Sequence, residues 1–319
     1  MTMADVATAA VPLARVLRGD LVESVHLGHL VVLAPDGSVR LALGDPSVTI
    51  WARSALKPVQ AVAMLGSGLD VDRALLALVC ASHSGEGGHL AVVRTLLSLA
   101  GMGSDDLRNT PGWPLDPDAA FQWRSDGHGS EPITQNCSGK HAGMLATCAE
   151  NGWSRSYLDP THPLQLAIRA TVEDLTGVAV QHETVDGCGA PLFSTTLVGL
   201  ARSFGRISSA DEGPRARVAR AMTGHPWHVA GTGRDATRFM EAVPGLVAKD
   251  GADGVYAAGL PDGSAVAFKV LDGSARPRSA VLAAALAVAG VDPSLVEAVG
   301  LTPVLGHGSP VGEVVAALS

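Results

Sequence analysis

Lysine is scarce in this chain of 319 residues. Only four of its 23 Lys and Arg residues are lysines: Lys57, Lys140, Lys249 and Lys269. A protein that uses arginine for surface charge has little reason to keep a lysine, unless that lysine must lose its proton, which arginine cannot do. Each lysine is therefore a candidate functional residue, with an ordinary surface position as the alternative.

Long apolar runs and basic clusters are missing as well. No run approaches the roughly 18 residues that a membrane-spanning helix needs, and the most apolar helix candidate, 280–289, is too short. The formal net charge is −8, which argues against nucleic acid as a partner. Residues 1–5 lack a basic segment before an apolar run, so we expect no secretory signal and a cytoplasmic protein.

Cysteine is also infrequent, with four residues in the chain. In a cytoplasmic protein the expected state is the reduced thiol. Cys80 and Cys148 lie in apolar helical patterns and are typical of core residues. Cys137 and Cys188 lie in polar segments that contain glycine, so the sequence indicates another role for these two.

Two β-hairpins are predicted near the ends of the chain, after a start that looks disordered. They pair 30–33 with 39–43 and 254–258 with 266–270. Helical patterns occupy 54–65, 73–80, 90–99, 141–151, 163–175, 193–204, 214–222, 234–242 and 277–289. Because strands and helices do not alternate, we expect an α+β fold in which both hairpins join one antiparallel sheet flanked by helices, as a single unit over residues 1–319.

The segment Arg53-Ser54-Ala55-Leu56-Lys57-Pro58 carries a Ser-x-x-Lys pair. On a helix, residues three apart share a face. A buried, neutral lysine can take the serine proton and create a nucleophile, as in serine β-lactamases and penicillin-binding proteins. The pattern alone is weak, and a helix N-cap serine beside an exposed lysine is the alternative.

Two further segments offer groups that could assist such a pair. The segment Ser82-His83-Ser84-Gly85-Glu86 follows an apolar helix, and its hydroxyl groups suit proton transfer or substrate binding. Capping of a helix end by these hydroxyls is the alternative. Lys269 stands in a predicted strand, where Ser-x-x-Lys enzymes commonly place a second lysine; a solvent-facing lysine is the alternative.

The two loop cysteines raise the question of a metal. Cys137 and Lys140 are three residues apart in the block 136–143, and Cys188 lies in the turn 186–191. Two cysteines can bind Zn²⁺ when further ligands exist. The spacing does not reach a Cys₄ or Cys₂His₂ pattern, so from spacing alone structural glycine turns are favoured over a metal site.

Taken in order, these segments resemble a known family, the Rhizobium-etli-type L-asparaginases of class 3, or asparaginase II. The resemblance rests on Arg53-Ser54-x-x-Lys57-Pro58, Cys80-Ala81-Ser82-His83-Ser84-x-Glu86, Asn136-Cys137-Ser138-Gly139-Lys140-His141-Ala142-Gly143 and Asp186-Gly187-Cys188. It extends to Val22-Glu23-Ser24-x-His26-x-Gly28 and Ala230-Gly231-Thr232-Gly233-Arg234. The family is similar in fold to serine β-lactamases and glutaminases, which agrees with the α+β prediction.

The resemblance also implies roles for individual residues. It implies two Ser–Lys pairs in the active site: Ser54 with Lys57, and Ser82 with Lys269. It implies a zinc site completed by water: Cys137, Lys140 and Cys188. It implies contacts near the substrate: Arg53, Asp186 and His141. One position departs from the pattern, because Ala236 stands where family members can carry a further cysteine.

The function implied by the resemblance is hydrolysis of L-asparagine to L-aspartate and ammonia, with Zn²⁺ as cofactor, in a homodimer. Glutamine differs from asparagine by one methylene, which sequence does not resolve. A glutaminase, another Ser-x-x-Lys amidase or a β-lactamase-like hydrolase is therefore one alternative. A zinc-binding homologue without catalysis is the other.

Overall fold

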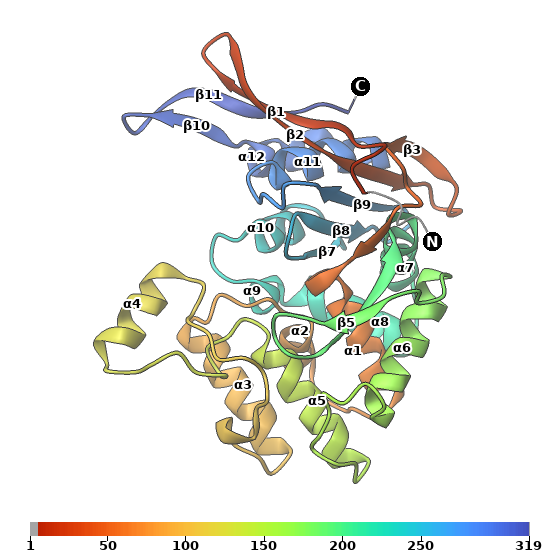
Figure 1. The fold of residues 1–319 in the computed structure, drawn as a ribbon, viewed down its shortest axis with the longest axis vertical. Helices are drawn as coiled ribbons and strands as arrows, with labels where there is room; N and C mark the ends of the chain where they lie inside the picture. Colours follow the sequence, from red (N-terminus) through yellow and green to blue (C-terminus); the bar gives the residue numbers. More distant parts are fainter. Residues whose placement is uncertain (1–5, 319) are drawn as a thin grey trace.

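The computed structural model describes residues 6–318, which adopt an α+β architecture (Figure 1). Within that range, eight strands form an antiparallel sheet in the order β10-β11-β1-β2-β9-β8-β7, with β3 also paired to β2. These strands are β1 (Val11–Arg18), β2 (Leu21–Leu33), β3 (Val39–Leu43), β7 (Val247–Asp250), β8 (Val255–Gly259), β9 (Ala265–Val270), β10 (Pro303–Gly306) and β11 (Ser309–Ala316).

The two ends of the chain meet in this sheet. Strand β2 pairs with β9, with Leu30 opposite Phe268, and β1 pairs with β11. Strands β8 and β9 bury successive residues, so both faces of the sheet are covered there. The covering helices include α7 (Leu197–Ser208) and α11 (Arg278–Ala289). The predicted antiparallel sheet flanked by helices is confirmed, whereas the single unit stays a prediction.

The middle of the chain is mainly helical. Helix α1 (Lys57–Gly66) lies at its centre and contacts α2, α5, α6 and α8. The other helices are α2 (Arg73–Val79), α3 (Gly87–Leu99), α4 (Pro117–Ser125), α5 (Ser138–Glu150), α6 (Pro163–Thr176), α8 (Gly213–Gly224), α9 (Pro226–Val229), α10 (Asp235–Ala242) and α12 (Pro293–Gly300), with 3₁₀ turns η1 (Arg53–Leu56) and η2 (Ser104–Asp106). A small sheet has the order β4 (Thr49–Trp51), β6 (Pro191–Thr196), β5 (Glu183–Val185).

Two sequence predictions of secondary structure were wrong. The start of the chain is not irregular from residue 11, because Val11–Arg18 forms β1 between β2 and β11 and buries Leu13 and Val16. The segment 193–204 is not helical throughout. Its first residues belong to β6, which lies between β4 and β5, and α7 begins only after Thr196, whose side chain accepts a hydrogen bond from the Gly199 N–H.

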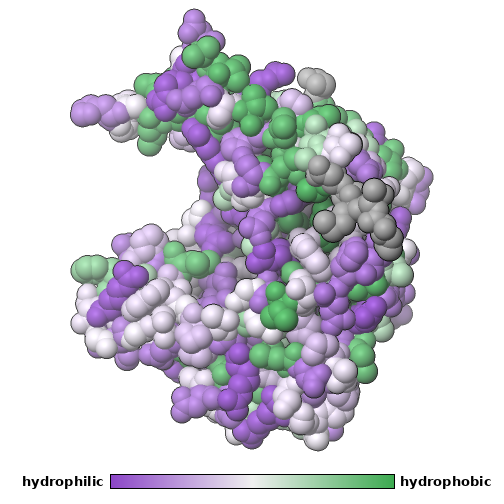
Figure 2. Space-filling view, viewed as in Figure 1, coloured by the Kyte–Doolittle hydropathy of each residue, from purple (hydrophilic) through white to green (hydrophobic). Residues whose placement is uncertain are grey.

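A deep notch opens on one side of the molecule (Figure 2). On one side of the notch lies the part of the sheet with β10, β11 and the β1–β2 hairpin. On the other side lies the helical part that carries α4. Helices α9 and α10 border the notch in Figure 1. No helix among residues 6–318 is long and apolar enough to cross a membrane. Residues 1–5, on which the prediction about a secretory signal rests, lie outside the described range.

Candidate active site

The Ser-x-x-Lys pair lies where η1 runs into α1. Arg53, directly before Ser54, has a φ of +53°, a backbone conformation that is uncommon outside glycine and that recurs at sharp turns presenting a nucleophile. Ser54 is partly exposed, whereas Lys57 is 1% exposed. Pro58 fits the first turn of α1, where its missing N–H costs nothing. The turn therefore offers the serine to solvent and buries the lysine.

The buried amine of Lys57 is held by two oxygen atoms. Its Nζ donates to the carbonyl of Ala81 at 2.6 Å and to Ser82 Oγ at 3.0 Å. The segment that carries Ser82 is fixed in turn, because the Ser82 N–H donates to the carbonyl of Val229 at 3.0 Å. We call Ser54, Lys57 and Ser82 the Ser–Lys–Ser arrangement, because Ser82 Oγ contacts the Lys57 amine and Ser54 precedes Lys57 by three residues in the same turn.

The expected pairing of Ser82 with Lys269 is not the arrangement that the structure has. Lys269 lies on β9, is partly exposed, and donates to the carbonyl of Asp253. Strand β8 separates β9 from the edge strand β7, so Lys269 is two strands away from the sheet edge. The lysine beside Ser82 is Lys57.

Sequence reasoning named Lys249 only as one of the four scarce lysines and gave it no role, yet it is completely buried at the end of β7. Its Nζ donates to the backbone and side-chain oxygens of Asp250, both at 2.6 Å. Burial, together with repulsion from Lys57, lowers the pKa of Lys249 to about 8. Attraction to Asp250 acts in the opposite direction and raises the pKa, but it does not offset the burial. The end of β7 reaches η1, because a Cβ on Gly251 would lie 2.8 Å from the Ala52 carbonyl. The signal was present in Lys249-Asp250-Gly251, which resembles the Lys-Thr-Gly motif of serine β-lactamases.

The three residues expected at a zinc site lie together beside Lys57. Cys137 and Cys188 are buried in a small cluster, and the Nζ of Lys140 lies 3.2 Å from the Cys188 sulfur. A hydrogen bond from Cys188 lowers the pKa of Cys137 well below its ordinary value, with further lowering by Lys57 and Lys140. The same bond raises the pKa of Cys188. The pair therefore holds one thiolate among amines.

The chemistry of this cluster fits zinc, although it is not an ordinary zinc site. Two thiols and a buried amine are donors that Zn²⁺ accepts once they are deprotonated. Among residues 6–318, no three His, Cys, Asp or Glu side chains are grouped so that they could hold a metal ion. A zinc ion here would therefore need Lys140 in its neutral form as a ligand.

Arg53 and Asp186 adjoin the cluster. Arg53 donates from Nε to Asp186 at 2.7 Å and forms an ion pair with Asp253. Burial acts to raise the pKa of Asp186, but Lys140 and Arg53 hold it below its ordinary value. Asp186 is therefore an ionised carboxylate beside the Ser–Lys–Ser arrangement.

His141 lies deeper than the other predicted residues. It is fully buried, and its Nδ1 is 3.0 Å from the Tyr157 hydroxyl, while its Nε2 is buried without a hydrogen-bond partner. Burial lowers the pKa of His141 well below the ordinary value, so the ring is neutral. Its contact with a substrate stays a prediction. Ala236, at the departing position, is buried in α10.

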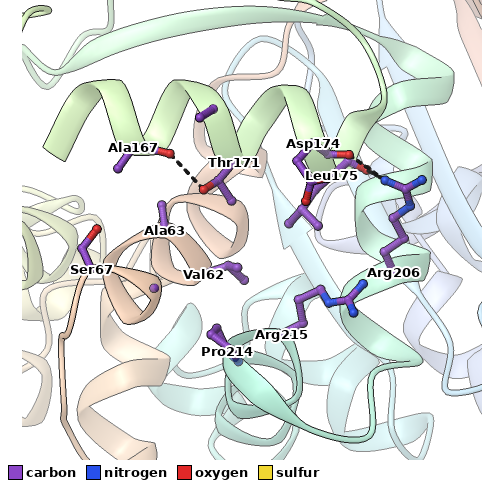
Figure 3. A pocket seen from close by; sticks show the side chains of 12 residues that line it. Val62, Ala63, Ser67, Ala167, Thr171, Asp174, Leu175, Arg206, Pro214 and Arg215 are labelled. Carbon is purple, nitrogen blue, oxygen red and sulfur yellow. Dashed lines mark hydrogen bonds between the residues drawn. The ribbon is translucent and has the colours of Figure 1, made fainter. Parts of the chain in front are cut away.

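A pocket elsewhere in the helical part does not coincide with this site. It has a volume of about 860 Å³ and lies between α1, α6 and α8 (Figure 3). It is lined by the second half of α1, from Val62 onward, and by Arg206 and Arg215, whereas Lys57 starts the helix. Arg206 donates to the carbonyl of Asp174 at 2.6 Å, so that side chain is engaged in holding α6 to α7. We place the chemistry at the Ser–Lys–Ser arrangement.

A Ser-x-x-Lys turn with a second serine on the lysine, in an α+β fold, defines a candidate serine–lysine hydrolase. The chain matches the sequence model described as L-asparaginase II over residues 14–316. It therefore belongs to the L-asparaginase II family, a family of amidohydrolases. No curated protein was found to match the chain.

Solved structures with a similar fold have low identity to this chain. A β-lactamase from Mycobacterium bovis is 15% identical, with a TM-score of 0.44, and the match covers 85% of this chain and 93% of the other. A chain described as a putative β-lactamase from Bacteroides dorei is 15% identical, with a TM-score of 0.42 and coverage of 76% and 85%. The protein Mglu in a Tris- and glutamate-bound form is 17% identical, with a TM-score of 0.34 and coverage of 81% and 58%.

Proposed function

We propose that this chain hydrolyses the side-chain amide of L-asparagine, giving L-aspartate and ammonia. The observation that carries the proposal is the position of the Lys57 amine, 3.0 Å from Ser82 Oγ and three residues after Ser54, in a member of the L-asparaginase II family. One buried amine beside two hydroxyl groups suits acyl transfer, because it can accept and return the proton that each step moves.

In the first step, Ser54 Oγ attacks the amide carbon, and the serine proton passes to Lys57. The C–N bond then breaks. The leaving nitrogen takes a proton from Lys57, directly or through the hydroxyl of Ser82, and departs as ammonia. The product of this step is an ester between Ser54 and the aspartyl group.

In the second step, water attacks the ester and gives its proton to Lys57. The C–O bond breaks, Ser54 Oγ regains a proton, and aspartate is released.

Zinc, when bound, would be held by Cys137, Lys140 and Cys188 and would act as a Lewis acid that organises the pocket. The cysteine cluster is already coupled to Lys57, since the charge of Lys57 lowers the pKa of Cys137. In this proposal the nucleophile is a serine and not a zinc-bound hydroxide. The zinc cluster therefore acts mainly on substrate affinity. A cytoplasmic location and a homodimer remain part of this proposal.

The test is ammonia release by the purified protein from L-asparagine, L-glutamine and a chromogenic β-lactam. Ser54→Ala and Ser82→Ala are the variants, and Ser67→Ala, at the far end of α1, is the matched control. We expect release from asparagine by the wild type and by Ser67→Ala, loss in Ser54→Ala, and an acyl-enzyme detectable by mass spectrometry on Ser54 alone. Full activity in Ser54→Ala would refute the mechanism, and preference for glutamine or the β-lactam would replace the substrate.

A further inference from the structure

Two arginines flank the Ser–Lys–Ser arrangement, one beside each serine. Arg53 directly precedes Ser54 in the chain. Arg234, from the loop before α10, places its Nη1 3.5 Å from the backbone carbonyl of Ser82. Both side chains are 24% exposed, so each reaches the site from the solvent side. Their surroundings differ in charge, and that difference bears on how a substrate binds.

The carboxylates beside Arg53 are already paired with cations. Its guanidinium is held by Asp186 at 2.7 Å and by Asp253. Lys140 also acts on Asp186, and Lys269 donates to the backbone carbonyl of Asp253. Arg53 is therefore engaged with these two carboxylates.

The surroundings of Arg234 carry an excess of positive charge. Asp250 is shared by three cations: Lys249 at 2.6 Å, Arg234 at 3.0 Å and Arg278 at 3.5 Å. Arg278 also pairs with Asp235 at 3.3 Å. Three cations and two carboxylates leave an excess of one positive charge in this cluster.

The excess positive charge is presented at Arg234. The side chain of Lys249 is fully buried and that of Arg278 is 14% exposed, against 24% for Arg234. A buried cluster with an unbalanced charge is costly unless an anion completes it. Arg234 is the member from which a ligand anion can be reached, and a guanidinium binds a carboxylate with two parallel hydrogen bonds.

We infer that Arg234 binds the α-carboxylate of the substrate. The inference rests on the proposed hydrolysis of an amino acid amide and adds the residue that binds the carboxylate of that substrate. Arg53 is already engaged with Asp186 and Asp253, so Arg234 is the arginine that the ligand carboxylate reaches.

The experiment compares three amides. L-Asparagine carries both charges, succinamate lacks the ammonium group, and β-alaninamide lacks the carboxylate. Arg234→Gln removes the cation, Arg234→Lys keeps the ion pair with Asp250, and Arg238→Gln, on the exposed face of α10, is the matched control. In Arg234→Gln we expect kcat/KM to fall about 10- to 100-fold for asparagine and succinamate, which is the range for a hydrogen bond to a charged group. For β-alaninamide, which has no carboxylate, kcat/KM should stay within about threefold of the wild-type value.

The ratio between substrates separates binding from positioning. An equal fall on all three amides would mean that Arg234 only positions Ser82, and an unchanged kcat/KM would mean that it contacts nothing in the substrate; both results overturn the inference. If the wild type releases no ammonia from asparagine, the proposed function fails. The carboxylate site is then tested by measuring whether L-aspartate raises the melting temperature of the protein. A rise in the wild type that Arg234→Gln abolishes supports the site; no rise, or the same rise in both, overturns it.

Discussion

The Nζ of Lys57 lies 3.0 Å from Ser82 Oγ, although the sequence motif joins Lys57 to Ser54. The same amine donates to the carbonyl of Ala81, so two neighbouring residues of one segment hold it in place. Its charge also lowers the pKa of Cys137. In the proposed mechanism, the reaction at Ser54 and the state of the cysteine cluster are therefore linked through this one side chain.

Replacing Lys57 is expected to abolish turnover. Lys57→Met removes the base, and Lys57→Arg keeps the charge but cannot lose a proton, so both should lower kcat by about 1,000-fold or more, within the range for general acid–base groups. The measurement is steady-state ammonia release, with Lys269→Arg as the control that keeps most of the activity. A Lys57→Arg enzyme with more than about a tenth of wild-type kcat would contradict this role.

Among the four cysteines, zinc content is expected to depend on Cys137 and Cys188. Cys137→Ser and Cys188→Ser should purify without zinc, because hydroxyl groups replace the thiolate ligands. Cys148→Ser, a buried core cysteine outside the cluster, should retain the metal. Atomic emission spectroscopy on the purified proteins gives the metal content, together with KM for asparagine before and after chelation.

The role of the metal is read from which constant changes. An organising zinc raises KM when it is removed and leaves residual turnover at saturating substrate. Complete loss of turnover without a change in affinity would instead assign the metal a direct part in the reaction. Equal zinc in Cys148→Ser and Cys137→Ser would show that it binds elsewhere.

Two hairpins of the sheet could be predicted from sequence, but not all of its strands. Pro-Asp-Gly turns mark β2–β3 and β8–β9, because the turn residues are local signals. The hairpins β1–β2 and β10–β11 have no Pro-Asp-Gly turn between apolar runs, so this local signal does not mark them. In addition, β1 pairs with β11 from the other end of the chain, a long-range pairing that no local pattern predicts, which is why 11–18 was missed.

The site could be predicted where its residues form short motifs. The scarcity of lysine pointed in the right direction, since Lys57, Lys140 and Lys249 are at most 2% exposed. The choice between Lys249 and Lys269 depended on which strand lies at the sheet edge beside η1. That follows from the strand order β9-β8-β7, a non-local property, and the three-residue pattern Lys249-Asp250-Gly251 is too short to decide it alone.

The protein is expected to become more stable as pH rises through the range in which Lys249 loses its proton. The folded pKa of Lys249 is about 8, below the 10.5 of an unperturbed lysine, so between these values the unfolded chain binds more protons than the folded one. The free energy of unfolding should therefore rise between pH 8 and 9.5, by about 2 kcal/mol for this group alone. Below pH 8 this contribution is constant and unfavourable.

Urea unfolding at pH 7.5 and 9.5 measures this dependence in the wild type and in Lys249→Met. The rise attributable to Lys249 should be absent in the variant. Val247→Ala, on the same strand, controls for general destabilisation, because it leaves a cavity but changes no titrating group. The same pH dependence in Lys249→Met and the wild type would assign the lysine an unshifted pKa.

Gly139, between Cys137 and Lys140, is expected to tolerate no side chain. A Cβ there would strike the backbone carbonyl of Leu78 and lie 2.8 Å from its Cγ, so Gly139→Ala forces α5 away from α2 and should cost about 1–3 kcal/mol of stability. Gly66→Ala, where a Cβ meets nothing within 4 Å on α1, should instead stabilise by about 0.5 kcal/mol. Urea unfolding compares both variants with the wild type. Because Gly139 adjoins the cysteine cluster, Gly139→Ala should also bind less zinc. If Gly139→Ala were as stable as the wild type, α2 and α5 would not be in close contact.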